Sequence, residues 1–218
     1  MLDFSILTNH FSEYLRGLGN TLAASLITLV ASLIIGTVLA VMRVVRVRVL
    51  NIIGTAYVEF IRNIPFILIV FLFYYGSAGF EINLNGFVAG ALGLTVYTSA
   101  FIAETVRAGI LSISKGQMKA ARSSGLSYLQ SMRYIILPQA MRIVIPPLGN
   151  QFLNLIKNTS VLGLIAGFDL MYYGDLIQSD TFQTFDVYIF VAVFYLVLTI
   201  PLSLLVKYLE HRLAREVA

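Results

Sequence analysis

Long runs of apolar residues alternate with short polar segments along this chain of 218 residues. Four uncharged stretches stand out, at residues 17–42, 63–80, 82–103 and 187–206. Each approaches or exceeds the roughly 20 residues that an α-helix needs to cross a bilayer. A fifth apolar region, residues 140–166, is interrupted by Arg142 and Lys157, so an interfacial or re-entrant segment is the alternative there.

The pattern predicts an all-α integral membrane protein with a single domain over residues 1–218. We expect five transmembrane helices, near residues 18–42, 51–75, 86–108, 140–166 and 187–208. A large cytoplasmic loop, about residues 109–139, is expected to contain a short helix, and residues 167–186 are expected to form an outer loop.

Residues 1–16 alternate apolar and charged positions loosely, which predicts an amphipathic helix on the outer surface. Asp3 and Glu13 stand where a secretory signal peptide would carry basic residues. The 26 uncharged residues from 17 to 42 also exceed the 7–15 residues of a signal-peptide core. We therefore expect the first span to be retained.

The composition excludes an ordinary soluble domain, because 58% of residues are hydrophobic and only 12% are charged, against a usual charged share of about 25%. The charges are distributed unevenly. Basic residues cluster after the first, third and fifth spans, at Arg43, Arg46, Arg48, Arg107, Lys115, Lys119, Arg122, Arg133, Arg142, Lys207, Arg212 and Arg215. Acidic residues occupy the opposite loops, at Glu81, Asp169, Asp175, Asp180 and Asp186.

This distribution predicts a multi-pass membrane protein with its N-terminus outside and its C-terminus in the cytoplasm. It also accounts for the net charge of +4 without a nucleic-acid partner. The chain has no cysteine, so neither disulfides nor thiolate chemistry is available to it.

Two charged pairs lie inside or at the edges of the predicted spans. Glu59 and Arg62 are three residues apart, as are Glu104 and Arg107, so the members of each pair share a helix face. An ionised group near the middle of a membrane costs at least about 2.5–3.5 kcal/mol. The pairs therefore either fix helix contacts, within or between helices, or line and gate a transport path.

The fourth span is the most polar. After Pro146-Pro147, which are expected to kink it, Asn150, Asn154, Lys157 and Asn158 recur on one helix face, with Gln151 beside them. Amides supply donors and acceptors, and the Lys157 cation suits a carboxylate, so the stripe fits a small zwitterionic ligand. Hydrogen bonding between helices is the alternative. Thr98 and Ser99 in the third span are candidates for the same cavity.

The loop after the third span contains Lys119-Ala-Ala-Arg-Ser-Ser-Gly125, followed after nine residues by Ile135-Ile-Leu-Pro138. The small residues Ala120, Ala121 and Gly125 would let another protein's surface approach the backbone closely. This pattern indicates a docking helix on the cytoplasmic face. Leu137 and Pro138 would mark the entry to the fourth span.

The spacing resembles the EAA loop, Glu-Ala-Ala-x3-Gly-x9-Ile-x-Leu-Pro, of importer permeases driven by ATP-binding-cassette (ABC) ATPases. Only the first position differs, where Lys119 replaces Glu. Flanking stretches resemble the same family, at Gly19-Asn-Thr-Leu22, Tyr57-Val-Glu-Phe-Ile-Arg-Asn-Ile-Pro65, Ser99–Ile110 and Leu148-Gly-Asn-Gln-Phe152. The chain therefore looks like a permease subunit of a polar amino acid ABC importer of the histidine/glutamine/arginine/opine type.

The resemblance implies a type I ABC importer permease fold, a place in the bacterial cell (inner) membrane and a non-catalytic role. Two such subunits, alike or different, would form the pore, and an extracytoplasmic binding protein or fused binding domain would deliver an amino acid. Magnesium and ATP would bind to a partner ATPase dimer, because this chain lacks Gly-x4-Gly-Lys-Ser/Thr. No catalytic residue, metal ligand or cofactor is expected in the chain itself. The ATPase-coupling residues would be Lys119, Ala120, Ala121, Gly125, Leu137 and Pro138.

Two positions depart from the family pattern. Lys119 inverts a charge, which indicates either a partner permease that keeps the Glu or an ATPase with an acidic groove rim. Asn63-Ile64 replaces Gly-Thr before Pro65, so flexibility there is expected to differ.

Gln151 bears on the substrate. A carboxylate at this position would favour a cationic amino acid, and Gln151 is neutral, so the sequence favours glutamine, other polar or acidic amino acids as the substrate.

The main alternative from another class is an ion-coupled secondary transporter or channel subunit, with Glu59 or Glu104 carrying the coupling charge. A membrane-anchored scaffold is a further alternative. Within the ABC class, an importer of peptides, sugars or ions is also compatible with the pattern.

Overall fold

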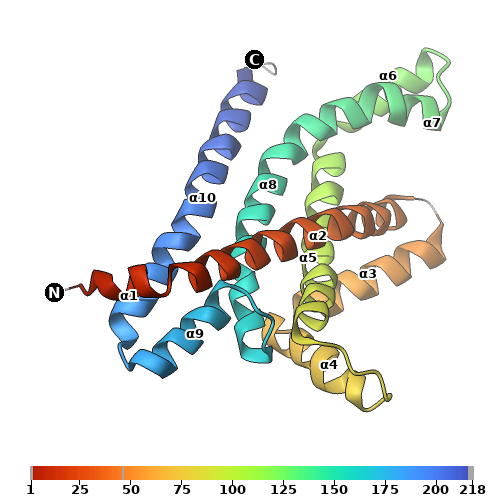
Figure 1. Ribbon diagram of the computed structural model, residues 1–218. Coiled ribbons are helices and arrows are strands. Elements are labelled where there is room, and N and C mark those ends of the chain that lie inside the picture. The colour runs from red at the N-terminus through yellow and green to blue at the C-terminus, as the bar shows by residue number, and fades with distance from the viewer. Residues whose placement is uncertain (1, 46, 216–218) are drawn as a thin grey trace.

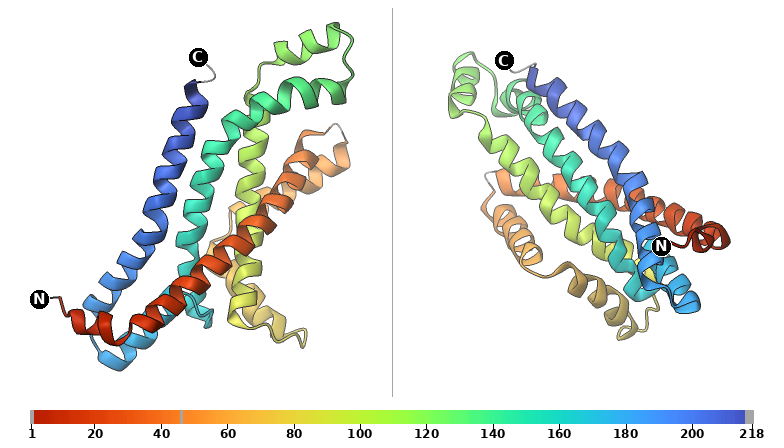
Figure 2. Two further views of the ribbon diagram at one scale, coloured as in Figure 1. Left: turned by 45° about the horizontal axis from the view of Figure 1, so that its top comes forward. Right: turned by 90° about the vertical axis from the view of Figure 1, so that its left-hand side faces the viewer.

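The structure, a computed structural model, describes residues 2–45 and 47–215. All regular secondary structure in these residues is helical. Arg46, one of the basic residues after the predicted first span, lies outside the described ranges. The N-terminal helix and the C-terminal end of the last helix lie at opposite ends of an elongated bundle (Figures 1 and 2).

Three helices are long and apolar enough to cross a membrane: α2 (Phe11–Val44), α5 (Gly86–Ser112) and α10 (Thr184–Arg215). Two bent pairs of helices pass the same test together, so the described residues provide up to five spans if each pair crosses the membrane once. One pair is α3 (Arg48–Arg62) with α4 (Phe66–Ala78); the other joins Tyr128–Ile165 to α9 (Leu170–Thr181). The chain is thus an all-α, multi-pass membrane protein.

The centre of the bundle is the crossing of α2 on α5, the most extensive helix contact in the described residues. The face that α2 buries is mostly small and polar, at Gly17, Thr21, Ala24, Ser25, Thr28, Ser32, Gly36 and Ala40. Membrane helices use such residues to approach one another closely. At Gly36, an added Cβ would lie 2.7 Å from Ile102 Cγ2 and 2.8 Å from the Ser99 carbonyl oxygen. The helix spacing here requires glycine.

The predicted span at residues 51–75 is not one helix. It divides into α3 and α4, whose axes differ by 100°. Pro65 cannot donate a backbone hydrogen bond, and it drives the preceding residue away from helical geometry. The Asn63 side-chain amide donates to the Glu59 carbonyl oxygen at 2.7 Å, which satisfies an acceptor at the end of α3.

The predicted span at residues 140–166 also differs from the structure. Its helix α8 (Leu137–Asn158) is not interrupted at Pro146-Pro147, so the prolines do not end it. The regular α-helix stops twelve residues further on, where η2 (Thr159–Ile165) continues as a 3₁₀-helix. Neighbouring groups in a packed membrane protein satisfy the carbonyls that proline leaves free.

The predicted outer loop at residues 167–186 contains a helix of twelve residues, α9. Asp169 caps it, and its carboxylate accepts hydrogen bonds from the backbone N–H groups of Met171 and Tyr172, each at 3.1 Å. Aspartate is a preferred residue at the N-cap of a helix. The polar composition of the segment nevertheless led to the prediction of a loop. Tyr195 of α10 donates a further hydrogen bond to the same carboxylate at 3.3 Å.

Polar residues of α2 hold the link between η2 and α9 in place. The Asn20 side-chain amide donates to the Phe168 carbonyl oxygen at 2.8 Å. The Leu170 N–H donates to the Thr21 hydroxyl at 3.0 Å. Phe168 has a φ of 57°, in the left-handed region that large residues rarely adopt. These bonds therefore hold an unfavourable turn against the first span.

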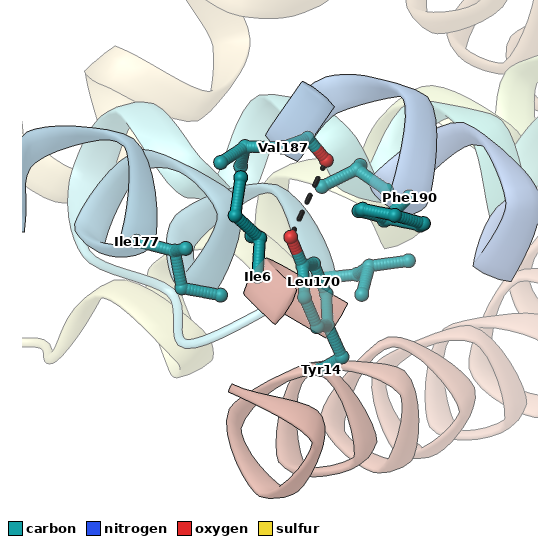
Figure 3. Close-up of a cluster of buried hydrophobic side chains, with 7 residues drawn as sticks. Ile6, Tyr14, Leu170, Ile177, Val187 and Phe190 are labelled. Atoms are coloured by element: carbon teal, nitrogen blue, oxygen red, sulfur yellow. Dashed lines mark hydrogen bonds between the residues drawn. The ribbon is translucent and has the colours of Figure 1, made fainter. Parts of the chain in front are cut away.

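The N-terminal segment is helical, as predicted, and one side of it packs against the bundle; its place on the outer surface of the membrane stays a prediction. Helix α1 (Phe4–Asn9) buries Ile6, and α2 starts early enough to bury Tyr14 completely. Figure 3 shows both residues in one apolar cluster with α9 and α10. The Tyr14 hydroxyl donates to the Val187 carbonyl oxygen at 3.4 Å, and the Tyr14 ring stacks on Phe194 at 5.2 Å between centroids.

Candidate functional site

A network of charged side chains joins α2, α3 and α5 near the end of the bundle that leads into the loop after α5. The Arg43 guanidinium lies 2.5 Å from Glu104 Oε2 and 3.5 Å from Glu59 Oε1. The Arg43 side chain is only 5% exposed. Its Nε has no hydrogen-bond partner among the described residues. Arg43 therefore depends on the two carboxylates for its stability inside the protein.

Of the two ion pairs that the sequence predicted, the described residues form only the one between Glu104 and Arg107. Arg107 pairs with Glu104 within α5, with Nη2 2.7 Å from Oε1. In the described part of the chain no ion pair joins Glu59 to Arg62. Arg62 instead lies 3.9 Å from Glu104. Glu104 is thus the centre of the network and binds cations from three helices.

The sequence did not identify Arg43 as part of this network, because it appeared to be one of the basic residues that follow the first span. The signal that was available is the length of the helix, since α2 extends through Val44 and keeps Arg43 on its buried face. Removing one partner of a buried ion pair lowers the stability of a protein by about 3–5 kcal/mol, because the other charge stays buried without a partner. The network therefore fixes how α2, α3 and α5 are arranged.

A pocket of about 450 Å³ lies between α5 and α8. Its lining from α8 comprises Gln151, Asn154, Leu155, Lys157 and Asn158, and its lining from α5 comprises Tyr97, Thr98 and Phe101. The structure thus brings most of the predicted polar stripe to one cavity. Sequence reasoning missed the two aromatic residues, which resemble ordinary lipid-facing or core positions.

Two predicted pocket residues lie elsewhere. The Asn150 side chain is exposed and does not line the pocket. Ser99 is fully buried on another face of α5, where its hydroxyl lies 3.0 Å from the Tyr57 hydroxyl and donates to the Val96 carbonyl oxygen at 2.8 Å. Ser99 therefore joins α5 to α3, and its neighbour Thr98 faces the pocket.

The pocket and the charge network meet at Phe101. The Arg62 guanidinium carbon lies 5.4 Å from the centre of the Phe101 ring, which lines the pocket. Phe101 also packs against Tyr97, with the ring centres 4.8 Å apart. Cations at this distance are attracted to the face of an aromatic ring. Movement of Phe101 would therefore affect both the pocket and Arg62.

The electrostatics of the pocket follow from its lining. Lys157 is the only charged residue among the described lining residues, and amides and hydroxyls supply the remaining polar groups. This arrangement can bind a carboxylate at Lys157 and can hydrogen-bond a neutral polar group at the amides. It offers no carboxylate to a cationic side chain.

The loop after α5 is mostly helical. Helix α6 (Lys115–Ser123) is capped by the Ser114 hydroxyl. It ends at Ser123, and Gly125, two residues further on, has a φ of 86°. The Leu126 N–H donates to the Ala121 carbonyl oxygen and the Gly125 N–H to that of Arg122, at 3.2 and 3.1 Å. This hydrogen-bond pair is the Schellman motif, which strongly favours glycine at the left-handed position.

The chain then returns to the bundle through α7 (Tyr128–Ser131) and η1 (Met132–Ile136), a π-helix. Leu137 and Pro138 begin α8, but helical structure runs through them without interruption from Tyr128. The segment predicted as a loop at residues 109–139 is therefore mostly helical. Helix α6 and the continuous helix that starts at Tyr128 form a hairpin, joined by a turn at Gly125. Figure 1 shows α6 and α7 projecting at one end of the bundle.

The predicted coupling residues differ in accessibility. Lys119, Ala120 and Gly125 are exposed on the hairpin, whereas Ala121 is buried. Helix α6 packs on η1, so Ala121 holds the hairpin together. Leu137 and Pro138 are exposed at the start of α8.

Comparison with known proteins agrees with this geometry. The family described as "Binding-protein-dependent transport system inner membrane component" matches residues 32–215. The probable glutamine ABC transporter permease protein GlnM of Bacillus subtilis is 61% identical over 99% of this chain and 100% of its own length. The probable glutamine ABC transporter permease protein GlnP of the same organism is 36% identical over 88% of this chain and 89% of its own length.

A solved structure extends the likeness to three dimensions. A chain of the crystal structure of an amino acid ABC transporter with histidines superposes with a TM-score of 0.92. It is 33% identical to this chain, and the match covers 97% of this chain and 99% of the other.

Proposed function

The chain belongs to the family of inner membrane components of binding-protein-dependent transport systems, and from this premise we propose that it forms the translocation path for glutamine or a similar polar amino acid. It is a transmembrane permease subunit of an amino acid ABC importer. The observation that carries the substrate proposal is the pocket between α5 and α8, in which one lysine stands among amides and hydroxyls.

The side chains would divide the recognition of the amino acid. Lys157 would bind the α-carboxylate, and Gln151 and Asn154 would hydrogen-bond the side-chain amide, since amides both donate and accept. Tyr97 and Phe101 would contact the aliphatic part of the substrate. A cationic side chain would find no counter-charge, which disfavours arginine and lysine. The relatives named as glutamine permeases support this choice.

Glu59 and Arg62 would act beside the pocket. Arg62 contacts both Phe101 and Glu104, so a change in the helix arrangement would be transmitted to the pocket. Glu104 and Arg43 would hold the helices on which this movement depends.

The partners would bind at opposite ends of the bundle. An ATPase dimer in the cytoplasm would contact the α6 hairpin, through Lys119, Ala120 and Gly125, with Leu137 and Pro138 at the base. ATP and magnesium would bind to the ATPase, and this chain would supply no catalytic residue or cofactor. An extracytoplasmic binding protein or fused binding domain would deliver the amino acid at the end that holds α1 and α9. In this arrangement the N-terminus would lie outside and the C-terminus in the cytoplasm.

A second permease subunit would complete the pore. The two Bacillus relatives carry different names and match this chain to different degrees, at 61% and 36% identity. We propose that this chain pairs with a paralogous subunit.

ATP binding to the partner ATPase would drive the change between conformations of the transporter. ATP would favour one conformation only to the extent that it binds that conformation more tightly.

The test is reconstitution of this subunit with its partner subunits, ATPase and binding protein in liposomes. ATP hydrolysis and uptake would be measured with glutamine, asparagine, glutamate, histidine and arginine added singly. We expect glutamine to stimulate both activities and arginine to stimulate neither. Uptake that proceeds without ATP and follows an ion gradient would contradict the proposal in favour of an ion-coupled transporter.

A further inference from the structure

One face of α6 points away from the protein. Ala121 is buried and Met118 partly buried, so they define the inner face, which packs on η1. Successive helical residues are rotated by about 100°, so the outermost strip comprises Gly116 and Ser123, with Lys119 and Ala120 on either side of them. All four are exposed. Lys119 is the only long side chain among them.

The charge of this region is uncompensated. Between Glu104 and Asp169 the sequence has no acidic residue. Arg122 is held by its own turn, because its guanidinium donates to the Leu126 carbonyl oxygen at 2.9 Å. Lys119 has no acidic partner among the residues that the structure describes. Its ammonium group is therefore available to a partner molecule.

We propose that Lys119 recognises a carboxylate on the ATPase, so that this chain docks in a groove with an acidic residue at its centre. The proposal rests on the proposed function and specifies the chemistry of its partner. Gly116 and Ser123 flank Lys119 with minimal bulk, which lets a partner backbone approach while the lysine reaches into the groove. Opposite charges across an interface fix the register and exclude wrong partners.

The alternative ligand is an anionic lipid surface, which basic loops also attract. Helices that lie in the membrane interface carry large apolar residues on one face to anchor them. The outward face of α6 has glycine, serine and alanine beside its basic residues. Helix α6 also forms one arm of the hairpin that projects at one end of the bundle (Figure 2). Both observations favour a protein groove.

The experiment measures binding of the nucleotide-free ATPase to the complete permease in nanodiscs of neutral phosphatidylcholine. Lys119→Glu is compared with Lys119→Gln and with Lys115→Glu, which makes the same charge change at the flank of the same helix. We expect Lys119→Glu to weaken binding about tenfold or more, and Lys119→Gln to weaken it less. Lys115→Glu is expected to change it by no more than about fivefold.

A second measurement identifies the carboxylate. The chain has no cysteine, so Lys119→Cys provides a single site for cross-linking to the ATPase. Replacing the acidic residue nearest the cross-link by lysine is expected to restore binding to Lys119→Glu. Failure of this exchange would overturn the proposal.

Other results would also overturn it. Unchanged binding by Lys119→Glu would do so, and so would equal losses in Lys119→Glu and Lys115→Glu, which indicate diffuse attraction. A charge effect that appears only in nanodiscs with anionic phosphatidylglycerol would assign Lys119 to lipid. A wild-type permease that binds no ATPase would contradict the proposed function itself, and this inference with it.

Discussion

The guanidinium of Arg43, near the end of the first long helix, lies 2.5 Å from the carboxylate of Glu104 on α5. The two residues are 61 positions apart in the chain. Glu104 also binds Arg107 of its own helix and lies 3.9 Å from Arg62 of α3, so one carboxylate links α2, α3 and α5.

Glu104→Gln should destabilise the protein, because it leaves the buried Arg43 with only the distant Glu59 carboxylate. We expect a loss of about 3 kcal/mol, at the low end for a broken buried pair because Glu104 is partly exposed. Thermal unfolding of the purified protein in detergent measures this. Glu59→Gln is the matched control, since the Glu59 side chain is 53% exposed, and it should cost less than about 1 kcal/mol. Equal losses in both variants would contradict the central role of Glu104.

Gly36→Ala should push α2 away from α5, since the new methyl group would overlap Ile102 and the Ser99 carbonyl oxygen. Overpacking of this kind costs about 1–3 kcal/mol. Gly19→Ala in the same helix is the control, because nothing lies within 4 Å of its added Cβ. That variant should be neutral or slightly stabilising, since alanine favours a helix over glycine. The melting temperatures of the two variants give the comparison, and a stable Gly36→Ala protein would refute the close approach.

Gly125→Val should distort the turn that follows α6, because a β-branched residue is strained at a φ of 86°. We expect binding-protein-stimulated ATP hydrolysis and amino acid uptake to fall together, while the permease still reaches the membrane. Gly125→Asn should retain most of both activities, since asparagine also adopts the left-handed conformation at helix ends. Full activity of Gly125→Val in the reconstituted transporter would show that this turn is not needed for coupling.

Gln151→Glu should alter substrate preference, because it places a carboxylate in a pocket whose described lining has none. We expect arginine or lysine to gain stimulation of ATP hydrolysis relative to glutamine, by about tenfold, the effect of one charge-assisted contact. Asn150→Asp introduces the same charge one residue earlier, on a side chain that does not line the pocket. It should leave the preference unchanged, and a shift of similar size in both variants would locate the substrate elsewhere.

The helical, membrane-spanning character of the chain was determined by its sequence. Uncharged runs long enough to cross a bilayer have few other stable structures, since every backbone group must find its hydrogen bond internally. The α6 helix was predictable for a related local reason, because Ser114 and Gly125 form its two ends. The face of α8 that carries Asn154 and Lys157 followed from helical periodicity.

The tertiary structure alone decided which residues meet. Arg43 and Glu104 are far apart in the chain, and no local pattern indicates that the end of α2 packs on α5. Local patterns likewise did not show that Ser99 and Asn150 lie outside the pocket, although the adjacent residues Thr98 and Gln151 line it. Local rules fix which direction a side chain takes relative to its own helix. How each helix is rotated against its neighbours depends on long-range contacts such as Gly36 with Ile102 and Arg43 with Glu104.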